Sequence, residues 1–343
     1  MRRALLIGLG LLCLVPNAQA AAERSWAQPQ IAAIVEAGLL ADSVAAFEPQ
    51  KPLTQRALGA ALETLSLAAE EPSSFRYRAA VPGRAVTIRE LDAALVSHLG
   101  LGDAARAVTT ALRDAGLAPK AGVGTETVAR LLGFRTNHPA DQDALELGPN
   151  DPATRAEAAY SFARLLELSV WEQDSVRRAT EELVLPELTT LQTQVLRRAV
   201  SFVGWPYVWG GMSESPQQTF GKTQPGGFDC SGFVWRVFKL EPFAGASALA
   251  TVLRGRTTYQ LSGEVPAAQR IRKIENLQPG DLMFQGDRGP KSKPAEVGHA
   301  AIYLGGGWFV HSSGSGTTLH PLEGWYRDRF AWARRPLREA GLA

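Results

Sequence analysis

Cysteine is nearly absent from this chain, whose 343 residues contain only Cys13 and Cys230. A disulfide framework is therefore excluded, and so are metal sites built from closely spaced cysteines. A strong charge of one sign is also missing, because 36 Lys and Arg oppose 34 Asp and Glu for a net charge of +2. Loss of Arg2 and Arg3 with a leader would reduce +2 to 0, so nucleic-acid binding is excluded.

The apolar run from Ala4 to Val15 is too short to span a membrane. It follows Arg2 and Arg3 and precedes Pro16 and the small-residue pattern Ala18 to Ala20, which predicts a signal peptide over 1–20. An uncleaved anchor is the alternative, but about a dozen apolar residues fall short of the roughly 20 that cross a bilayer. We expect secretion to the cell wall or periplasm, no transmembrane segment after cleavage, and Cys230 as the single remaining thiol.

Residues 21–169 are rich in Ala and Leu at helical spacing and predict a mainly helical region. Three helices are expected to begin after Thr54, Thr87 and Thr154, where each threonine caps the new helix. The latter two are followed three positions later by Glu90 and Glu157, which predicts a capping box.

The same region resembles surface-layer-homology repeats. The resemblance is carried by 31–40, 47–49 and Thr54, and its ending recurs at Gly148 to Ala153, directly before Thr154 to Glu157. It implies non-covalent anchoring to cell-wall polymers, with the arginine of Thr-Arg-Ala-Glu supplying positive charge. The other two copies carry Gln55 and Ile88 at that position, so a purely structural helical domain is the alternative.

The composition and the predicted secondary structure change along the rest of the chain. Polar helical sequence over 170–190 predicts a linker that is broken at Leu185-Pro186. Residues 191–343 contain short strands, aromatics and Gly-rich turns, including 281–284, 299–304 and 308–311, and predict a separate α+β domain.

Cys230 lies in Gly226 to Gly232, and the apolar spacing that follows predicts a helix with the thiol at its N-terminus. The positive end of a helix and a nearby imidazolium lower a thiol's pKa, which would activate Cys230 as a nucleophile before substrate arrives. A small buried hydrophobe is the alternative for a free cysteine. The flanking Asp229, Ser231 and glycines disfavour it.

Two histidines, His299 and His311, lie on strands expected to pair across Gly305 to Gly307. If the turn centres on Gly306, Ala301 pairs with His311 and His299 lies diagonally beside it on the same face. A two-residue turn at Gly305-Gly306 would place them on opposite faces, so a triad requires a three-residue turn or a bulge. His299 would then act as base and His311 would orient it.

Other roles for these histidines stay open. One Cys and two His can ligate zinc, but no closely spaced ligand pair is present, so we expect no metal and no cofactor. His320 fits no motif and is expected at the surface.

Several blocks taken together resemble the NlpC/P60 family of cysteine peptidases over roughly 190–338. The blocks, in order, are Gly204 to Gly211, Asp229 to Gly232, Pro279 to Leu282, Gly298-His299, and His311. The resemblance implies a papain-like fold, in which the helix that bears Cys230 packs on an antiparallel sheet that carries both histidines. It also implies substrate-binding roles for Tyr207, Asp229 and Ser231, with the Cys230 amide in an oxyanion hole. A core aromatic and a helix cap are the alternatives for Tyr207 and Asp229.

Residues 212–228 and 286–296 depart from the family's usual spacing. Both are rich in Gly, Pro, Lys and Ser and are expected to be loops beside the catalytic blocks.

Together with the predicted signal peptide, the resemblance implies a secreted peptidoglycan hydrolase, a cysteine endopeptidase that cleaves stem peptides next to D-glutamate. An amidase or acyltransferase with the same Cys-His chemistry is one alternative. A non-enzymatic wall-binding protein is the other.

Overall fold

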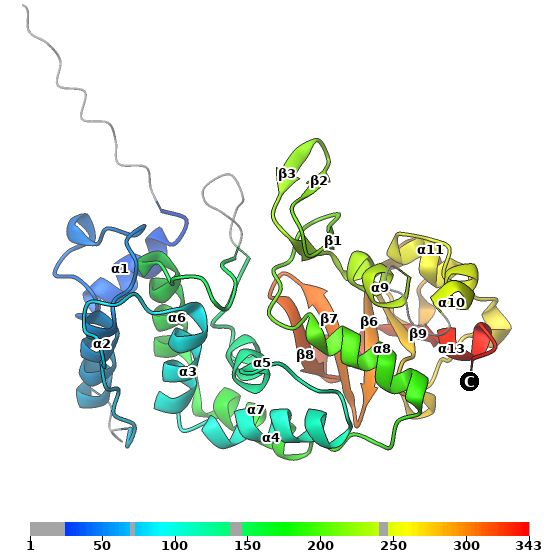
Figure 1. The fold of residues 1–343 in the computed structure, drawn as a ribbon, viewed down its shortest axis with the longest axis horizontal. Coiled ribbons are helices and arrows are strands. Elements are labelled where there is room, and N and C mark those ends of the chain that lie inside the picture. Colours follow the sequence, from blue (N-terminus) through cyan, green and yellow to red (C-terminus); the bar gives the residue numbers. More distant parts are fainter. Residues whose placement is uncertain (1–24, 69–72, 138–145, 240–245, 343) are drawn as a thin grey trace, which may run out of the picture.

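The computed structural model describes residues 25–68, 73–137, 146–239 and 246–342. A helical part and a part built on a β-sheet lie side by side along the long axis (Figure 1). Across these described ranges, no helix combines the length and apolar character that a membrane crossing requires. The predicted signal peptide over 1–20 lies outside the described residues.

The helical part confirms the mainly α-helical prediction for the N-terminal region. Its helices are α1 (Gln28–Glu36), α2 (Gln55–Ala68), α3 (Ile88–His98), α4 (Gly102–Asp114), α5 (Val123–Leu131), α6 (Arg155–Glu167) and α7 (Val170–Glu181). The Thr54 hydroxyl accepts from Ala57 N, and Thr87 forms a full capping box with Glu90, as predicted. Thr154 caps α6 by accepting from Glu157 N, while the Glu157 carboxylate lies 3.5 Å from Arg135.

Three short segments that precede α2, α3 and α6 pair with one another in a closed cycle. Leu53 N donates to Ala153 O, Ala153 N donates to Val86 O, and Val86 N donates to Leu53 O, each at 2.8 Å. All three side chains are fully buried. The region is thus built from three equivalent loop-helix units, and this arrangement makes Gln55, Ile88 and Arg155 structurally equivalent.

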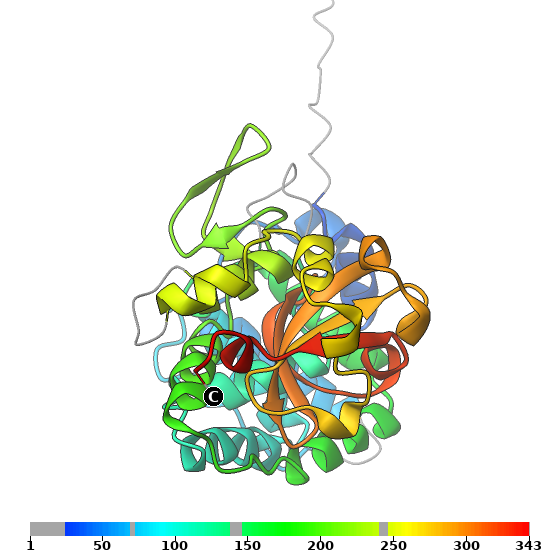
Figure 2. The ribbon, with the colours of Figure 1, turned by 90° about the vertical axis from the view of Figure 1, so that its right-hand side faces the viewer.

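The C-terminal part is an antiparallel sheet with helices, so the α+β prediction is confirmed. Its strands, in the order β8-β7-β6-β5-β9, are β5 (Leu282–Gly286), β6 (Val297–Gly305), β7 (Trp308–Ser313), β8 (Gly316–Pro321) and β9 (Phe330–Arg334). The helices are α8 (Thr190–Ser201), α9 (Cys230–Phe238), α10 (Ala246–Val252), α11 (Thr258–Gly263), α12 (Gly324–Asp328) and α13 (Pro336–Glu339). Helices α8 and α9 pack together on one side of the sheet (Figures 1 and 2).

The turn between β6 and β7 confirms the predicted bulge. Ile302 pairs with Val310 and Tyr303 with Phe309, but Gly305 pairs with Trp308, so the register shifts by one residue before the turn. Side chains alternate between the faces of a sheet, so this shift is what places His299 and His311 on one face.

The segment 212–228 is not the loop that was predicted. It forms β1 (Met212–Ser213), β2 (Gln217–Thr219), β3 (Lys222–Gln224) and β4 (Gly227–Phe228), and the β2–β3 hairpin projects from the body (Figure 1). Phe220 and Gly221 at its tip both adopt positive φ, of 50° and 77°. Phe-Gly is an uncommon pair for such a turn, which favours Asn or Asp before Gly. The residues of this segment therefore did not predict a hairpin. The second segment, 286–296, holds two short 3₁₀ turns and otherwise irregular chain.

The two parts share buried contacts. Val108, Leu112 and Val123 from α4 and α5 belong to the same apolar cluster as Val195 and Leu196 of α8. Two further bonds join the helical part to the β7–β8 turn: Asn137 N donates to Gly314 O at 3.1 Å, and the Arg130 guanidinium donates to Ser315 O. Residues 182–189, between α7 and α8, are not helical. They include Leu185-Pro186, where the sequence predicted that the helix is interrupted.

Candidate active site

Cys230 is the first residue of α9, as predicted, and it is buried with 8% of its surface exposed. The backbone amides of Ala300 and Ser231 hydrogen-bond to its sulfur. Beside it, the Ser312 hydroxyl donates to Phe228 O at 2.8 Å. Strand β4 and the start of α9 therefore lie against both β6 and β7, next to the positions that carry the histidines.

Asp229 caps α9 and is held by several polar groups. Its Oδ1 accepts from Gly232 N at 2.5 Å and from the Ser231 hydroxyl at 3.0 Å, and its Oδ2 accepts from Gly210 N. Arg256 pairs with Asp229 at 3.2 Å and donates to Ser231 at 2.8 Å. These bonds position the first turn of α9, and the substrate-binding roles of Asp229 and Ser231 stay predictions.

Arg256 was missed by the sequence analysis. It lies 26 residues after Cys230 and belongs to none of the blocks that carry the family resemblance. Its role depends on contacts with residues far away in the sequence, and no local sequence pattern predicts such contacts.

Gly232 is required by close packing at the active site. A Cβ at this position would lie 1.9 Å from Gly211 O, well inside any allowed contact. The first turn of α9 therefore touches the backbone of the Gly210-Gly211 loop directly. This contact explains why a glycine follows Cys230-Ser231.

His299 and His311 form a direct pair. His299 Nε2 lies 2.9 Å from His311 Nδ1, and the two rings are nearly perpendicular, at 89°. His311 is almost fully buried, while His299 is partly exposed. The structure thus brings both predicted histidines together beside the strand segment that contacts the thiol.

Burial sets the charge states of Cys230, His299 and His311 in the resting protein. It raises the pKa of Cys230 to about 12, with a further rise from the Asp229 carboxylate. It also lowers the pKa of His299 to about 4 and that of His311 well below its ordinary value. The predicted lowering of the thiol's pKa is therefore wrong for the resting state, because desolvation outweighs the field of the helix end. A neutral thiol beside a neutral imidazole suits general-base-assisted attack on an acyl group.

Tyr207 lies close to the thiol. It bridges to Phe228 as part of a short parallel contact. Burial raises its pKa, and the nearby Cys230 and Asp229 side chains add to the rise. Its phenol is thus a neutral hydrogen-bonding group near the thiol.

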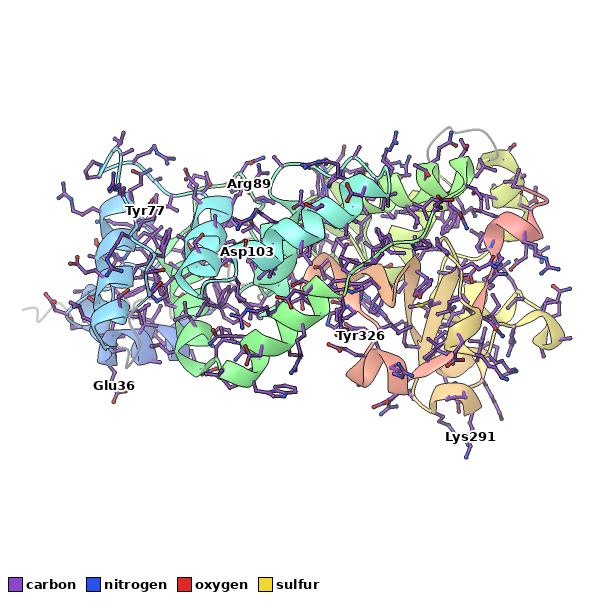
Figure 3. The ribbon with its side chains drawn as sticks, turned by 90° about the horizontal axis from the view of Figure 1, so that it is seen from below. Glu36, Tyr77, Arg89, Asp103, Lys291 and Tyr326 are labelled. Carbon is purple, nitrogen blue, oxygen red and sulfur yellow. The ribbon has the colours of Figure 1, made fainter. Side chains whose placement is uncertain are left out.

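His320 is not the surface residue that was expected. It is half-buried on β8, and its ring centroid lies 6.0 Å from that of His311. Tyr326 lies on α12 (Figure 3), and its ring centroid is 5.0 Å from that of His311 and 4.7 Å from that of His320. The sequence analysis missed Tyr326 because α12 is a short surface turn of helix outside every motif.

Among the residues that the structure describes, no group of three or more His, Cys, Asp or Glu side chains is placed to hold a metal ion.

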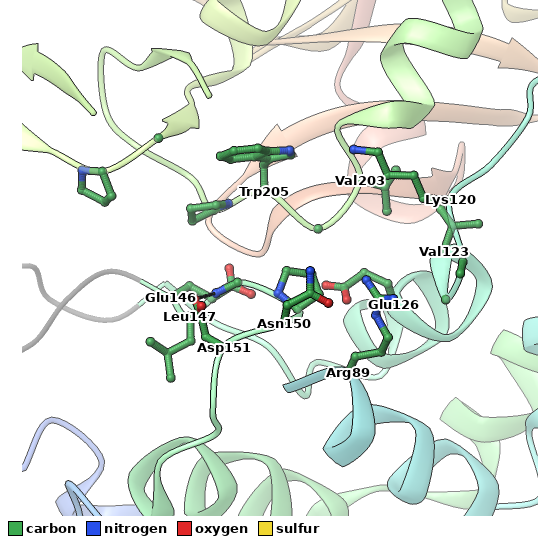
Figure 4. Close-up of a pocket in the computed structure, with 18 of the residues that line it drawn as sticks. Arg89, Lys120, Val123, Glu126, Glu146, Leu147, Asn150, Asp151, Val203 and Trp205 are labelled. Carbon is green, nitrogen blue, oxygen red and sulfur yellow. Dashed lines mark hydrogen bonds between the residues drawn. The ribbon is translucent and has the colours of Figure 1, made fainter. Parts of the chain in front are cut away.

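A separate cavity of about 470 Å³ lies between the helical part and the C-terminal domain (Figure 4). Trp205 faces it from the C-terminal side, and Arg89 and Asn150 face it from the helical side. Lys120 completes its rim. Cys230, His299 and His311 do not line this cavity.

Comparison with known proteins places the C-terminal domain in a family. Residues 204–335 match the profile of the NlpC/P60 family. Peptidoglycan endopeptidase RipB of Mycobacterium tuberculosis is 36% identical over 132 residues, which cover 37% of this chain and 46% of that protein. Gamma-D-glutamyl-L-lysine dipeptidyl-peptidase of Bacillus subtilis is 27% identical over 128 residues, which cover 37% and 34%.

A solved structure is also similar. The P60 domain of antigen MAP1204 from M. avium subspecies paratuberculosis is 27% identical and covers 42% of this chain and 93% of that one, with a TM-score of 0.31. The chain spans less than half the length of the two curated relatives above. The family match identifies residues 204–335 as an NlpC/P60 domain.

Proposed function

We propose that this protein is a secreted peptidoglycan hydrolase, a cysteine endopeptidase that cleaves stem peptides in the cell wall or periplasm. The observation that carries the proposal is the His299–His311 pair at 2.9 Å, with the backbone of Ala300, the residue after His299, at the buried thiol of Cys230. The names of the related RipB and dipeptidyl-peptidase support peptidoglycan as the substrate.

The proposed reaction has two acyl-transfer steps. His299 uses Nδ1 to accept the thiol proton as the sulfur of Cys230 attacks the scissile carbonyl carbon, because its Nε2 is engaged by His311. The Cys230 backbone amide stabilises the oxyanion. His299 then gives the proton to the leaving amine, the C–N bond breaks, and a thioester remains. Water, deprotonated by His299, hydrolyses the thioester and restores the thiol.

The bond that we propose is the one between D-glutamate and the diamino acid. The dipeptidyl-peptidase relative is named for a γ-D-glutamyl-L-lysine bond, and its similarity to this domain supports the assignment. Tyr207, near the thiol, would hydrogen-bond the substrate peptide as a neutral phenol.

Purified muropeptides incubated with the mature protein test the activity by mass spectrometry. We expect cleavage at the D-glutamyl bond with wild type and none with Cys230→Ala. Identical products from the two proteins would refute the hydrolase proposal. Transfer of the acyl group to an added amine in place of water would support the acyltransferase alternative, and release of the whole stem from the glycan would support the amidase alternative.

For the helical part, we propose binding to anionic cell-wall polymers through the cavity of Figure 4. Arg155, to which the repeat resemblance points, donates to Leu40 O and Phe47 O and stacks on Phe47, so its charge is engaged within the fold. Arg89 and Lys120 line the cavity, and the Glu126 and Glu146 carboxylates that also line it are paired with Arg130. Arg89 and Lys120 are the better candidates for contact with an anionic polymer.

Retention on cell-wall sacculi tests this second proposal. The full chain carrying Cys230→Ala should cosediment with sacculi, and the further substitution Arg89→Glu with Lys120→Glu should release it. Arg56→Glu with Arg113→Glu changes the charge equally at exposed sites of the same region and serves as the control. Equal retention of both double variants would show that the cavity is not the binding site for the polymer.

A further inference from the structure

One aromatic side chain lies along the row of residues that contains His311. Phe309, His311 and Ser313 alternate along β7, so they share one face of the sheet. The ring of Tyr326 lies 5.0 Å from the ring centroids of both Phe309 and His311. The Ser313 side chain lies close enough to the phenol to lower its pKa, although burial raises that pKa overall. Tyr326 thus lies along the same strand face beside three alternating positions.

The same ring also contacts the histidines of the neighbouring strands. Its centroid lies 5.9 Å from that of His299 on β6 and 4.7 Å from that of His320 on β8. Three adjacent strands therefore each present one imidazole to Tyr326. Among the described aromatic contacts, no other ring touches all three.

The tautomers of this group follow from the proposed reaction. If His299 Nδ1 is the base, Nε2 carries the hydrogen and donates to His311 Nδ1, so His311 carries its own hydrogen on Nε2. That Nε2 is buried and has no hydrogen-bonding N or O partner among the described residues. The rings of His311 and Tyr326 are perpendicular, at 90°, an arrangement that allows an N–H edge of one ring to meet the face of the other.

His320 does not compete for the same role. Its Nδ1 lies 2.8 Å from Pro321 O, so Nδ1 carries the hydrogen and is engaged locally. Its ring stacks on Phe309 at 29°. It lies beside His311, but among the described residues His311 Nε2 forms no hydrogen bond with its ring.

We propose that Tyr326 is a positioning residue of the active site, whose ring face holds His311 in the Nε2–H tautomer and thereby directs the basic nitrogen of His299 to the thiol. This inference rests on the proposed function. Hydrophobic packing of α12 alone is the competing explanation. The two differ because packing constrains the position of the rings but not the site of the proton.

Trp325 provides a matched control on the same short helix. It is the neighbour of Tyr326, is also aromatic, and is 54% exposed to solvent. Tyr326→Leu removes the ring face beside His311, and Trp325→Leu removes an equivalent ring that does not contact the histidines. Tyr326→Phe keeps the ring and removes only the phenol hydroxyl.

Nitrogen-15 NMR of the free protein reads the tautomers without substrate. Wild type, Trp325→Leu and Tyr326→Phe should show His311 as the Nε2–H form, and Tyr326→Leu should show a mixture. With a cleavable muropeptide, Tyr326→Leu should lose on the order of 10- to 100-fold in kcat with KM within about twofold, because misorientation of a catalytic group costs rate rather than binding. Tyr326→Phe should stay within about threefold of wild type.

An unchanged tautomer in folded Tyr326→Leu would overturn the proposal, and so would equal losses of kcat in Tyr326→Leu and Trp325→Leu. Should Tyr326→Leu fail to fold, Tyr326→Met supplies the same measurement with a larger side chain in place of the ring. If muropeptides are not cleaved even by wild type, the proposed function fails. The NMR result would still decide whether Tyr326 sets the tautomer.

Discussion

His299 Nε2 and His311 Nδ1 lie 2.9 Å apart, on strands whose register shifts by one residue just before their turn. The contact uses Nε2 of His299, so Nδ1 is the nitrogen that the proposed reaction assigns to the thiol. It also fixes the orientation of a ring that is partly exposed to solvent. The pair is therefore the structural basis of the base and orienting roles proposed for the two histidines.

Alkylation of Cys230 by iodoacetamide should be slow at acidic pH. Burial raises the thiol's pKa to about 12, so the thiolate fraction and the rate should rise about tenfold per pH unit from pH 6 to 8. A plateau across that range would instead indicate a resting thiolate–imidazolium pair. Cys230→Ala provides the unlabelled control, followed by mass spectrometry.

The acid limb of kcat/KM should report His299. Its pKa is lowered to about 4, below the ordinary value of about 6.5, so the base stays neutral and competent at pH 5 to 7. Activity should then be lost as the pH falls through about 4, where His299 becomes protonated. An acid limb near 6.5 would contradict this assignment.

The loss of kcat on substituting His311 should depend on whether the new side chain can hydrogen-bond to His299, rather than on its size. His311→Asn retains an acceptor for His299 Nε2 and should lose about tenfold in kcat, whereas His311→Leu has similar bulk and should lose about 100-fold or more. Steady-state kinetics on the same muropeptide measure both. Equal losses would show that His311 acts only through packing.

Arg256→Met should weaken both stability and activity. It removes the partner of Asp229 and Ser231 at the start of α9, at a cost of about 1 to 3 kcal/mol in the free energy of unfolding. Arg254→Met, two residues earlier and exposed, should change neither. Urea unfolding and kcat/KM provide the measurements. If Arg256→Met and Arg254→Met give the same stability and the same kcat/KM, Arg256 has no role in the site.

Arg130→Met should destabilise the connection between the two parts of the chain. Arg130 is buried and pairs with Glu126 at 2.8 Å and Glu146 at 2.7 Å, and it donates to Ser315 O. Its loss leaves buried carboxylates uncompensated, at a cost of about 3 to 5 kcal/mol. Adding Glu146→Gln should recover part of this loss. No recovery in urea unfolding would mean that the charges of Glu146 and Arg130 are not coupled.

Local patterns were sufficient for several features. Capping threonines predicted the starts of α2, α3 and α6, because a cap depends on residues within one turn. Apolar spacing after Cys230 predicted α9 and the position of the thiol at its first residue. Alternation along two strands predicted that His299 and His311 could share a face only across a three-residue turn or a bulge, and the structure has the bulge.

Other features depend on contacts between residues far apart in the sequence. Residues near Cys230 suggested a lowered pKa, but the desolvation that raises it comes from the surrounding fold. Arg256, His320 and Tyr326 reach the site from separate elements, so no spacing along the chain reveals them. Helix starts and side-chain alternation are short-range properties that the order of residues settles. Charge state, the partner of Asp229 and the enclosure of His311 depend on which surfaces exclude water, and only the packed chain determines that.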